Sequence, residues 1–296
     1  MTVHRLTVAL QQVIVFALIL GCLVSPLAFA APASPVLAAT PPMRWVDAPS
    51  GHEHLDTAVW HYVRGKQRVD LIGAVHVGDR AYYRVLSNRF KKYDHLLFEL
   101  VKPEELDVRT MGPSDGKLST VQRWLKDRLG LEFQLDNIDY RANNFVHADI
   151  DSARLGSQLL DQAGNLVVSL LAFSITDSAR LTHADGSVRM GSVELALALT
   201  ARDQGQALKR YLGRELSEID MGAEEFGGLG FGSVLIRERN QVAIGVLQRE
   251  LAKKPKSLGI FYGAAHLPDL AKRLIAMGFT PAGQDWLVAW QLQPAH

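Results

Sequence analysis

Two stretches of sequence decide the fold: LIGAVHVGDRAYYRVL at residues 71–86 and IFYGAAHLPDLAKRLI at residues 260–275. They align without a gap, and each combines an apolar strand, a G-x-x-H motif and the start of an amphipathic helix. Continuous apolar runs of this length are typical of strands that are buried on both faces of a parallel sheet. The chain therefore contains the same β-α unit twice.

The first unit extends on both sides of its motif. The pattern predicts a strand over residues 69–75, a helix that Asp79 opens and that ends near Tyr93, and a second strand over residues 95–100. An upstream strand at residues 58–63 is expected to form a hairpin with the first strand. Its turn is expected at Gly65.

The second unit follows the same order. It is predicted as a strand over 258–262, a helix that starts at Pro268 and ends at Gly278, and a last strand over 286–292. Residues 118–253 are mostly helical by pattern, with a strand candidate at residues 131–138. The predicted fold class is α/β, with a central, mostly parallel sheet built from two similar β-α-β units and a large helical insertion between them.

The N-terminus has the pattern of an export signal. His4 and Arg5 precede an apolar run over residues 13–30 that ends in Ala-Phe-Ala. Residues 1–30 are therefore expected to be a cleaved signal peptide, and the protein to be periplasmic or extracellular. An uncleaved membrane anchor is the alternative interpretation, and lipidation at Cys22 is a minor one.

The rest of the chain is expected to be a Pro/Ala-rich tether over residues 31–44 and one α/β domain over residues 45–296. Without the leader, 31 basic residues balance 31 acidic ones, because one arginine of the 32 basic residues is removed. This balance gives no indication of nucleic acid or of a membrane surface as a partner. The single cysteine, Cys22, lies in the leader, which excludes a disulfide and a thiol nucleophile from the mature chain.

The histidines of the two motifs are the first candidates for chemistry. In parallel α/β sheets, ligands bind beyond the carboxyl ends of the strands, and His76 and His266 follow such ends. Gly73 and Gly263, three residues before each histidine, allow close approach of a neighbouring backbone or ligand. One motif alone would be weak evidence, but two in matching positions predict a shared site.

Glu99 is the third candidate. It lies in the apolar segment HLLFEL, whose strand is expected close to that of His76, and a carboxylate buried there needs a cation or a hydrogen-bond donor. Two histidines and one carboxylate would bind a divalent ion of the Zn, Mn or Co class and leave a position open for water. The alternative is a glutamate that points to solvent from an edge strand.

The helix predicted over residues 233–251 carries a second anomaly. Arg239 and Asn240 interrupt its apolar stripe, and an arginine rarely lies on a core face without a partner. Both are expected to project into the site, where Arg239 would stabilise developing negative charge. The alternative is an arginine that pairs structurally with a nearby acid.

Four further residues are candidates for a supporting role. Tyr140, Arg141, His147 and Asp149 lie in the segment DYRANNFVHAD, and an extended conformation would place His147 and Asp149 on one side. They are expected to orient the ligands of the site, with capping of the following helix by Asp149 or Asp151 as the alternative.

These motifs together resemble the TraB/PrgY/GumN family, which includes the TIKI proteins and is distantly similar to the erythromycin-esterase and ChaN-like folds. The resemblance covers roughly residues 55–292 and is carried by the paired G-x-x-H motifs, FEL (98–100), ERN (238–240) and YGAAHLPDL (262–270). It implies an α/β fold and, for the TIKI branch, metal-dependent proteolysis by His76, His266 and Glu99.

The expected function is therefore that of an exported, metal-dependent hydrolase, with a peptide as the substrate on the grounds of the resemblance and a small ester as the close variant. A protein that only binds and sequesters haem or a peptide is the alternative. A hydrolase without a metal, in which histidine and glutamate act directly as bases, is the third possibility.

Overall fold

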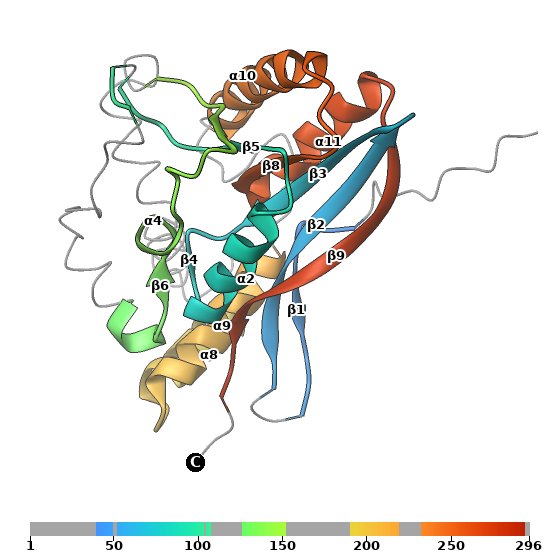
Figure 1. Cartoon of the computed structure of the whole chain (residues 1–296). Coiled ribbons are helices and arrows are strands. Elements are labelled where there is room, and N and C mark those ends of the chain that lie inside the picture. Colours follow the sequence, from blue (N-terminus) through green and yellow to red (C-terminus); the bar gives the residue numbers. More distant parts are fainter. Residues whose placement is uncertain are drawn as a thin grey trace, which may run out of the picture. The chain divides into compact units, whose positions relative to one another are not determined.

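In the computed structural model of this protein, the two G-x-x-H motifs lie at the ends of neighbouring parallel strands (Figure 1). These strands are β3 (Gln67–Ala74) and β8 (Leu258–Gly263). Their register sets Gly73 opposite Tyr262 and Ala74 opposite Gly263. Because parallel strands end at the same edge of a sheet, this register brings the two motifs side by side.

The described residues form a central sheet of seven strands. Its order is β1 (Met43–Val46), β2 (His54–Arg64), β3, β8, β5 (His95–Phe98) and β7 (Phe145–His147), and β9 (Thr280–Gln291) also pairs with β2. Among the described strands of this sheet, only β2 is antiparallel to β3. β1 and β9 are each antiparallel to β2, so they are parallel to β3. The predicted α/β class with a mostly parallel sheet is therefore confirmed.

The predicted hairpin joins β2 to β3. Arg64 pairs with Gln67, and Gly65 in the turn between them has a φ of 59°. Only glycine adopts this left-handed conformation without steric cost, so the turn occurs where the glycine allows it.

Helices cover both faces of the sheet. Side chains alternate between the faces along each strand, so Ile72 and Phe261 pack in one core while Leu71 and Ile260 pack in the other. The first core includes α2 (Arg80–Phe90), α8 (Met190–Thr200) and α9 (Gln204–Glu218), and the second includes α10 (Gly232–Ala252) and α11 (Leu267–Ala276) (Figure 1). Each fully buried Leu, Ile or Phe stabilises this arrangement by about 1.5–3 kcal/mol.

The region between the two units differs from the sequence prediction in one element. The expected strand over residues 131–138 is a two-residue strand, β6 (Glu132–Phe133), followed by a short helix, α4 (Gln134–Asn137). β6 pairs with β4 (Val77–Gly78) in a separate small sheet. Leu131, Gln134 and Ile138 are buried at a helical spacing, which explains why the apolar pattern did not continue as a strand.

The structure describes residues 40–49, 52–103, 105–107, 126–151, 190–218 and 232–293. The expected signal peptide and most of the expected tether lie outside these residues. The tether was expected to reach residue 44, but Met43 is already buried and is the first residue of β1. Helices α8, α9 and α10 show the expected helical insertion only in part. None of the described helices is long and apolar enough to span a membrane.

Candidate active site at the ends of β3 and β8

His76 lies two residues beyond the end of β3, in a backbone segment that is fixed on both sides. The hydroxyl of Tyr83 donates to the Val75 carbonyl at 3.1 Å. The backbone N–H of Gln134 donates to the His76 carbonyl at 2.9 Å. The imidazole is half-buried, so it remains accessible from solvent.

His266 ends a single 3₁₀ turn, η3 (Ala264–His266), that connects β8 to α11. Its ring is buried, with the residue 6% exposed. Nδ1 lies 2.7 Å from Oδ1 of Asn240, and the ring packs edge-on against Tyr262 with 5.1 Å between centroids. Helix α10 therefore holds the imidazole that follows β8.

The hydrogen bonds of Asn240 determine the tautomer of His266. Nδ2 of Asn240 donates to Oδ2 of Asp269 at 2.8 Å and to the His266 carbonyl at 3.2 Å. This assignment turns Oδ1, which only accepts, toward Nδ1 of the imidazole. Nδ1 must therefore carry the proton, and Nε2 presents a lone pair. Burial lowers the pKa of His266 to about 4, and the nearby cation Arg239 contributes to the decrease, so the ring is neutral near pH 7.

Glu99 follows β5 directly and turns its carboxylate toward the two histidines. Its backbone N–H donates to the Phe261 carbonyl at 3.1 Å. Oε2 accepts the backbone N–H of Gly263, and Oε1 accepts Nη2 of Arg239, both at 2.6 Å. Burial opposes ionisation, but Arg239 and the two imidazoles outweigh it and hold the pKa of Glu99 well below its ordinary value.

The three candidate ligands surround Gly263. A Cβ atom at this glycine would lie 3.4 Å from Oε2 of Glu99, 3.6 Å from Nε2 of His76 and 3.8 Å from Cδ2 of His266. Nε2 of His266 lies 3.6 Å from Oε1 of Glu99. The structure thus brings together the two histidines and the glutamate, although β8 separates the strands that carry His76 and Glu99.

The other motif glycine has a different role. A Cβ atom at Gly73 would lie 3.1 Å from the Ala58 carbonyl oxygen and 3.1 Å from Cδ2 of Leu267. Gly73 therefore allows β3 to pack against β2 and the start of α11, whereas Gly263 leaves space among the polar groups of the site.

Arg239 forms a buried double ion pair. Its Nε and Nη2 bind the two carboxylate oxygens of Asp149 at 2.9 and 2.6 Å, and Nη2 also binds Glu99. Burial works against its charge, but Glu99 and Asp149 raise the pKa of the guanidinium. Nη1 makes no hydrogen bond to any described residue. The pairing with an acid, which was the alternative interpretation of the sequence, is therefore present, and it leaves Nη1 without a partner among the described residues.

Asn240 and three of the four supporting candidates lie on the buried side of the site. They contact its residues or the residues next to them in the chain. Asn240 is fully buried, so it positions His266 and does not project into open space. His147 binds the Leu100 carbonyl through Nε2 at 2.7 Å, just after Glu99. Tyr140 is buried, accepts Nε2 of Gln134 at 2.8 Å and packs against Phe98, and Asp149 binds Arg239.

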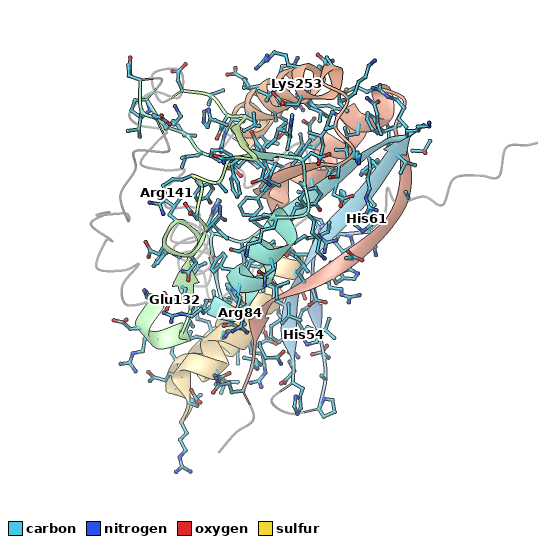
Figure 2. All side chains as sticks on the ribbon, in the orientation of Figure 1. His54, His61, Arg84, Glu132, Arg141 and Lys253 are labelled. Carbon is cyan, nitrogen blue, oxygen red and sulfur yellow. The ribbon has the colours of Figure 1, made fainter. Side chains whose placement is uncertain are left out.

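The structure does not bring Arg141 to the other predicted site residues. Its side chain is exposed at the periphery of the structure (Figure 2), where it pairs with Asp139 at 2.7 Å. The extended alternation that suggested a role applies only to β7, and Arg141 precedes this strand in a turn.

Sequence analysis missed two residues of the site. Asp269 accepts a hydrogen bond from the side-chain amide of Asn240. The sequence signal that could have identified it is its position three residues after His266, in the first turn of α11. Tyr262 donates its hydroxyl to the Ala148 carbonyl, which links β8 to the residue before Asp149. A tyrosine within a buried strand next to the motif glycine was its only signal.

The donor atoms suit a divalent metal ion in their chemistry. Nε2 of His266 and Oε1 of Glu99 are both acceptors and lie 3.6 Å apart. Oε1 already accepts Nη2 of Arg239, whereas Nε2 of His266 has no donor among the described residues. Two imidazoles with one carboxylate match the ligands of zinc-like ions. Among the described residues, however, no group of three or more His, Cys, Asp or Glu side chains is arranged as it would be around a bound metal ion.

Comparison with protein-family models, curated proteins and solved structures finds no match for this chain. The resemblance to the TraB/PrgY/GumN family therefore stays a prediction that rests on the motifs themselves.

Proposed function

We propose that this protein is a metal-dependent hydrolase whose site comprises His76, Glu99 and His266. The observation that carries the proposal is the pair of facing acceptors, Nε2 of His266 and Oε1 of Glu99, 3.6 Å apart. Asn240 and Asp269 fix the imidazole in the form that ligates, with its proton on Nδ1. A histidine with a purely structural role would be expected to form hydrogen bonds through both ring nitrogens. Nε2 of His266 instead directs its lone pair toward the ionised carboxylate of Glu99.

The ligands and Arg239 have different roles in this proposal. His76, His266 and Glu99 would hold the ion, which polarises a carbonyl and lowers the pKa of water when it is bound. Arg239 keeps Glu99 ionised and orients it through Asp149. Nη1 of Arg239, which makes no hydrogen bond to a described residue, would donate its N–H groups to the oxygen on which negative charge develops during attack on a carbonyl.

The proposed substrate is a peptide, with a small ester as the close variant. This part of the proposal rests on the resemblance of the G-x-x-H, F-E-L and E-R-N motifs to the TIKI branch. An exported protein with a site of this kind would act on peptides in the periplasm or outside the cell.

The test combines metal binding with turnover. Purified protein is treated with a chelator and titrated with Zn²⁺, Mn²⁺ or Co²⁺, and the melting temperature and the hydrolysis of a peptide library are measured. Metal that binds only the folded state raises its stability by RT ln(1 + [M]/Kd). We expect this increase and the hydrolysis in wild type, and the loss of both in His76→Ala and His266→Ala.

His54→Ala is the matched control, because His54 is a partly buried histidine of β2 whose ring contacts the His52 carbonyl, outside the residues of the site. It should retain metal binding. A folded His76→Ala variant with undiminished metal binding and hydrolysis would overturn the proposal. Metal binding without turnover of any peptide or ester would favour a sequestering protein, and turnover that is insensitive to chelators would favour direct acid-base catalysis.

A further inference from the structure

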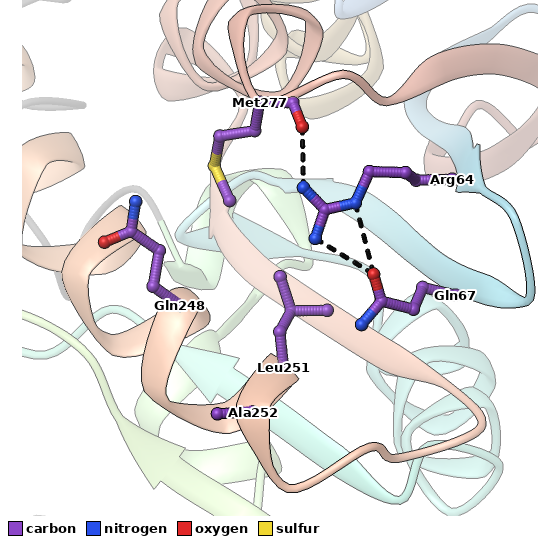
Figure 3. Close-up of a pocket in the computed structure, with 6 residues that line it drawn as sticks. All are labelled: Arg64, Gln67, Gln248, Leu251, Ala252 and Met277. Atoms are coloured by element: carbon purple, nitrogen blue, oxygen red, sulfur yellow. Dashed lines mark hydrogen bonds between the residues drawn. The ribbon is translucent and has the colours of Figure 1, made fainter.

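A cavity lies at the opposite end of β3 from the G-x-x-H motif. It has a volume of about 420 Å³ and is lined by Arg64, Gln67, Gln248, Leu251, Ala252 and Met277 (Figure 3). Gln67 begins β3 and Ala74 ends it, so seven residue steps, or about 23 Å at about 3.3 Å per residue, separate the two ends. This cavity is therefore distinct from the site around Gly263.

Arg64 supplies the only charge among the lining residues. Its guanidinium is held in place by neutral groups: Nη1 donates to the Met277 carbonyl at 2.6 Å, and Nε and Nη2 donate to Oε1 of Gln67 at 3.2 and 2.9 Å. It also stacks on the ring of Phe279, with 4.5 Å to the centroid. The side chain is thus fixed in one orientation before any ligand arrives.

No carboxylate neutralises this guanidinium within the part of the chain that the structure describes. Other partly or fully buried arginines differ: Arg89 pairs with Asp285, and Arg239 pairs with Glu99 and Asp149. A guanidinium has five N–H donors, and the three bonds of Arg64 leave two for a further acceptor. Two N–H groups on a planar cation match the two oxygens of a carboxylate.

The remaining wall of the cavity is largely apolar. Leu251, Ala252 and Met277 contribute apolar side chains to the lining, and Gln248 is drawn on the side away from Arg64 (Figure 3). The volume lies in the range of small-molecule sites, about 300–1,000 Å³. A single cation beside an apolar wall selects a monoanion with an apolar tail over a polyanion.

We propose that this cavity is a second ligand site, and that Arg64 binds the carboxylate of a small amphipathic monocarboxylate whose tail packs on Leu251 and Met277. Both a medium-chain fatty acid and the C-terminal residue of a peptide have this chemistry. The proposal does not depend on the hydrolytic site, because none of the cavity residues contacts His76, Glu99 or His266.

The experiment follows the methyl resonances of methionine in ¹³C-methyl-labelled full-length protein, with the Met277 signal assigned from Met277→Leu. Octanoate and N-acetyl-leucine are titrated separately, which distinguishes the two sources, and octanol and octylammonium are the uncharged and cationic controls. We expect a saturable shift of the Met277 signal with at least one carboxylate. Octanol and octylammonium should leave it unchanged.

Arg64→Gln should weaken carboxylate binding about tenfold or more, since charged hydrogen bonds are among the strong ones. Arg84→Gln, an exposed arginine on α2 (Figure 2), is the matched control and should bind like wild type. No shift of Met277 with either carboxylate, or equal shifts with octanol, would overturn the proposal. The wild-type comparison of carboxylate, alcohol and amine stays decisive if Arg64→Gln does not fold.

Discussion

Oδ1 of Asn240 lies 2.7 Å from Nδ1 of His266, and this contact makes α10 the element that sets the chemical state of the second motif histidine. The amide is in turn oriented by Asp269, which belongs to α11. The imidazole is therefore controlled by two helices that pack on each other. His76 has no comparable partner among the described side chains, so the two histidines of the repeated motif are not equivalent.

The first prediction concerns the tautomer of His266. In chelator-treated wild type near pH 7, the imidazole should carry its proton on Nδ1, because Asn240 offers that atom only an acceptor. Asn240→Ala should abolish this preference. It should also lower the free energy of unfolding by about 1–3 kcal/mol, since buried partners lose their hydrogen bonds.

Long-range ¹H–¹⁵N spectra of ¹⁵N-histidine-labelled protein report the tautomer directly, and urea unfolding reports the stability. Gln241→Ala is the control, because Gln241 is the next residue of the same helix and is exposed. An unchanged Nδ1–H tautomer in Asn240→Ala would show that the amide does not control the ring.

The second prediction concerns the buried ion pairs of Arg239. Replacement by leucine leaves the carboxylates of Glu99 and Asp149 buried without their cation. Arg239→Leu should therefore lower the free energy of unfolding by about 3–5 kcal/mol. Arg239→Lys should restore the charge but only part of the stability, because an ammonium group cannot reproduce the paired N–H geometry toward Asp149.

Urea denaturation followed by circular dichroism measures both variants. Arg141→Gln is the control, since that arginine forms only an exposed pair with Asp139, and it should leave the midpoint nearly unchanged. Equal stabilities of wild type and Arg239→Leu would mean that Glu99 and Asp149 are solvated or protonated.

Local pattern was sufficient to predict the elements that form the site. Strands β3, β5 and β8, helix α11 and the turn at Gly65 follow from apolar periodicity and from glycine positions, which are properties of neighbouring residues in the sequence. The last strand was expected only over residues 286–292, whereas β9 begins at Thr280. The pairing of His76 with His266 was predicted because a repeated motif, together with the rule that parallel strands end at one edge, carries information about distant residues.

The long-range arrangement was not accessible in the same way. The local sequence pattern does not predict that β8 lies between β3 and β5, or that β9 pairs with β2. The partner of Arg239 was left open for the same reason, because Asp149 lies 90 residues away in the chain. Burial shows that an arginine needs an acid, but only the packed fold determines which acid is within reach.

The third prediction concerns acid stability and a buried carboxylate outside the site. Asp70 accepts hydrogen bonds from Nδ1 of His61 at 2.8 Å, the Tyr93 hydroxyl at 2.7 Å and Nε of Arg68 at 3.1 Å. Burial opposes its ionisation, but these donors outweigh burial and hold the pKa of Asp70 below its ordinary value. Its stabilising effect is therefore complete above the unfolded-state pKa of about 3.9 and is lost as the pH falls through the lower folded-state pKa.

Asp70→Asn should consequently be less stable than wild type at neutral pH, and the difference between the two proteins should shrink below about pH 4. The free energy of unfolding in urea, measured from pH 7 to pH 3, tests this. Asp139→Asn is the comparison, because Asp139 is an exposed carboxylate with a lowered pKa. A difference between wild type and Asp70→Asn that is constant across this range would contradict the assignment.

The fourth prediction separates the two glycines of the repeated motif. At Gly263 the backbone has a φ of −52°, which suits any residue, and an added Cβ atom would make ordinary contacts with Glu99 and His76. Gly263→Ala should therefore fold with nearly unchanged stability, while the added methyl group occupies the space among the proposed ligands. Metal binding and hydrolysis should fall by about tenfold or more, because donor positions must be precise for a metal site.

Gly73→Ala should have the opposite profile. Its Cβ atom would press on the Ala58 carbonyl oxygen, which belongs to the adjacent strand and has little freedom to move. Overpacking of this kind costs about 1–3 kcal/mol, so the melting temperature should fall. Melting temperatures and metal titrations of both variants decide the matter: if Gly263→Ala binds metal like wild type, the ion is not held beside this glycine, and the shared motif serves packing in both copies.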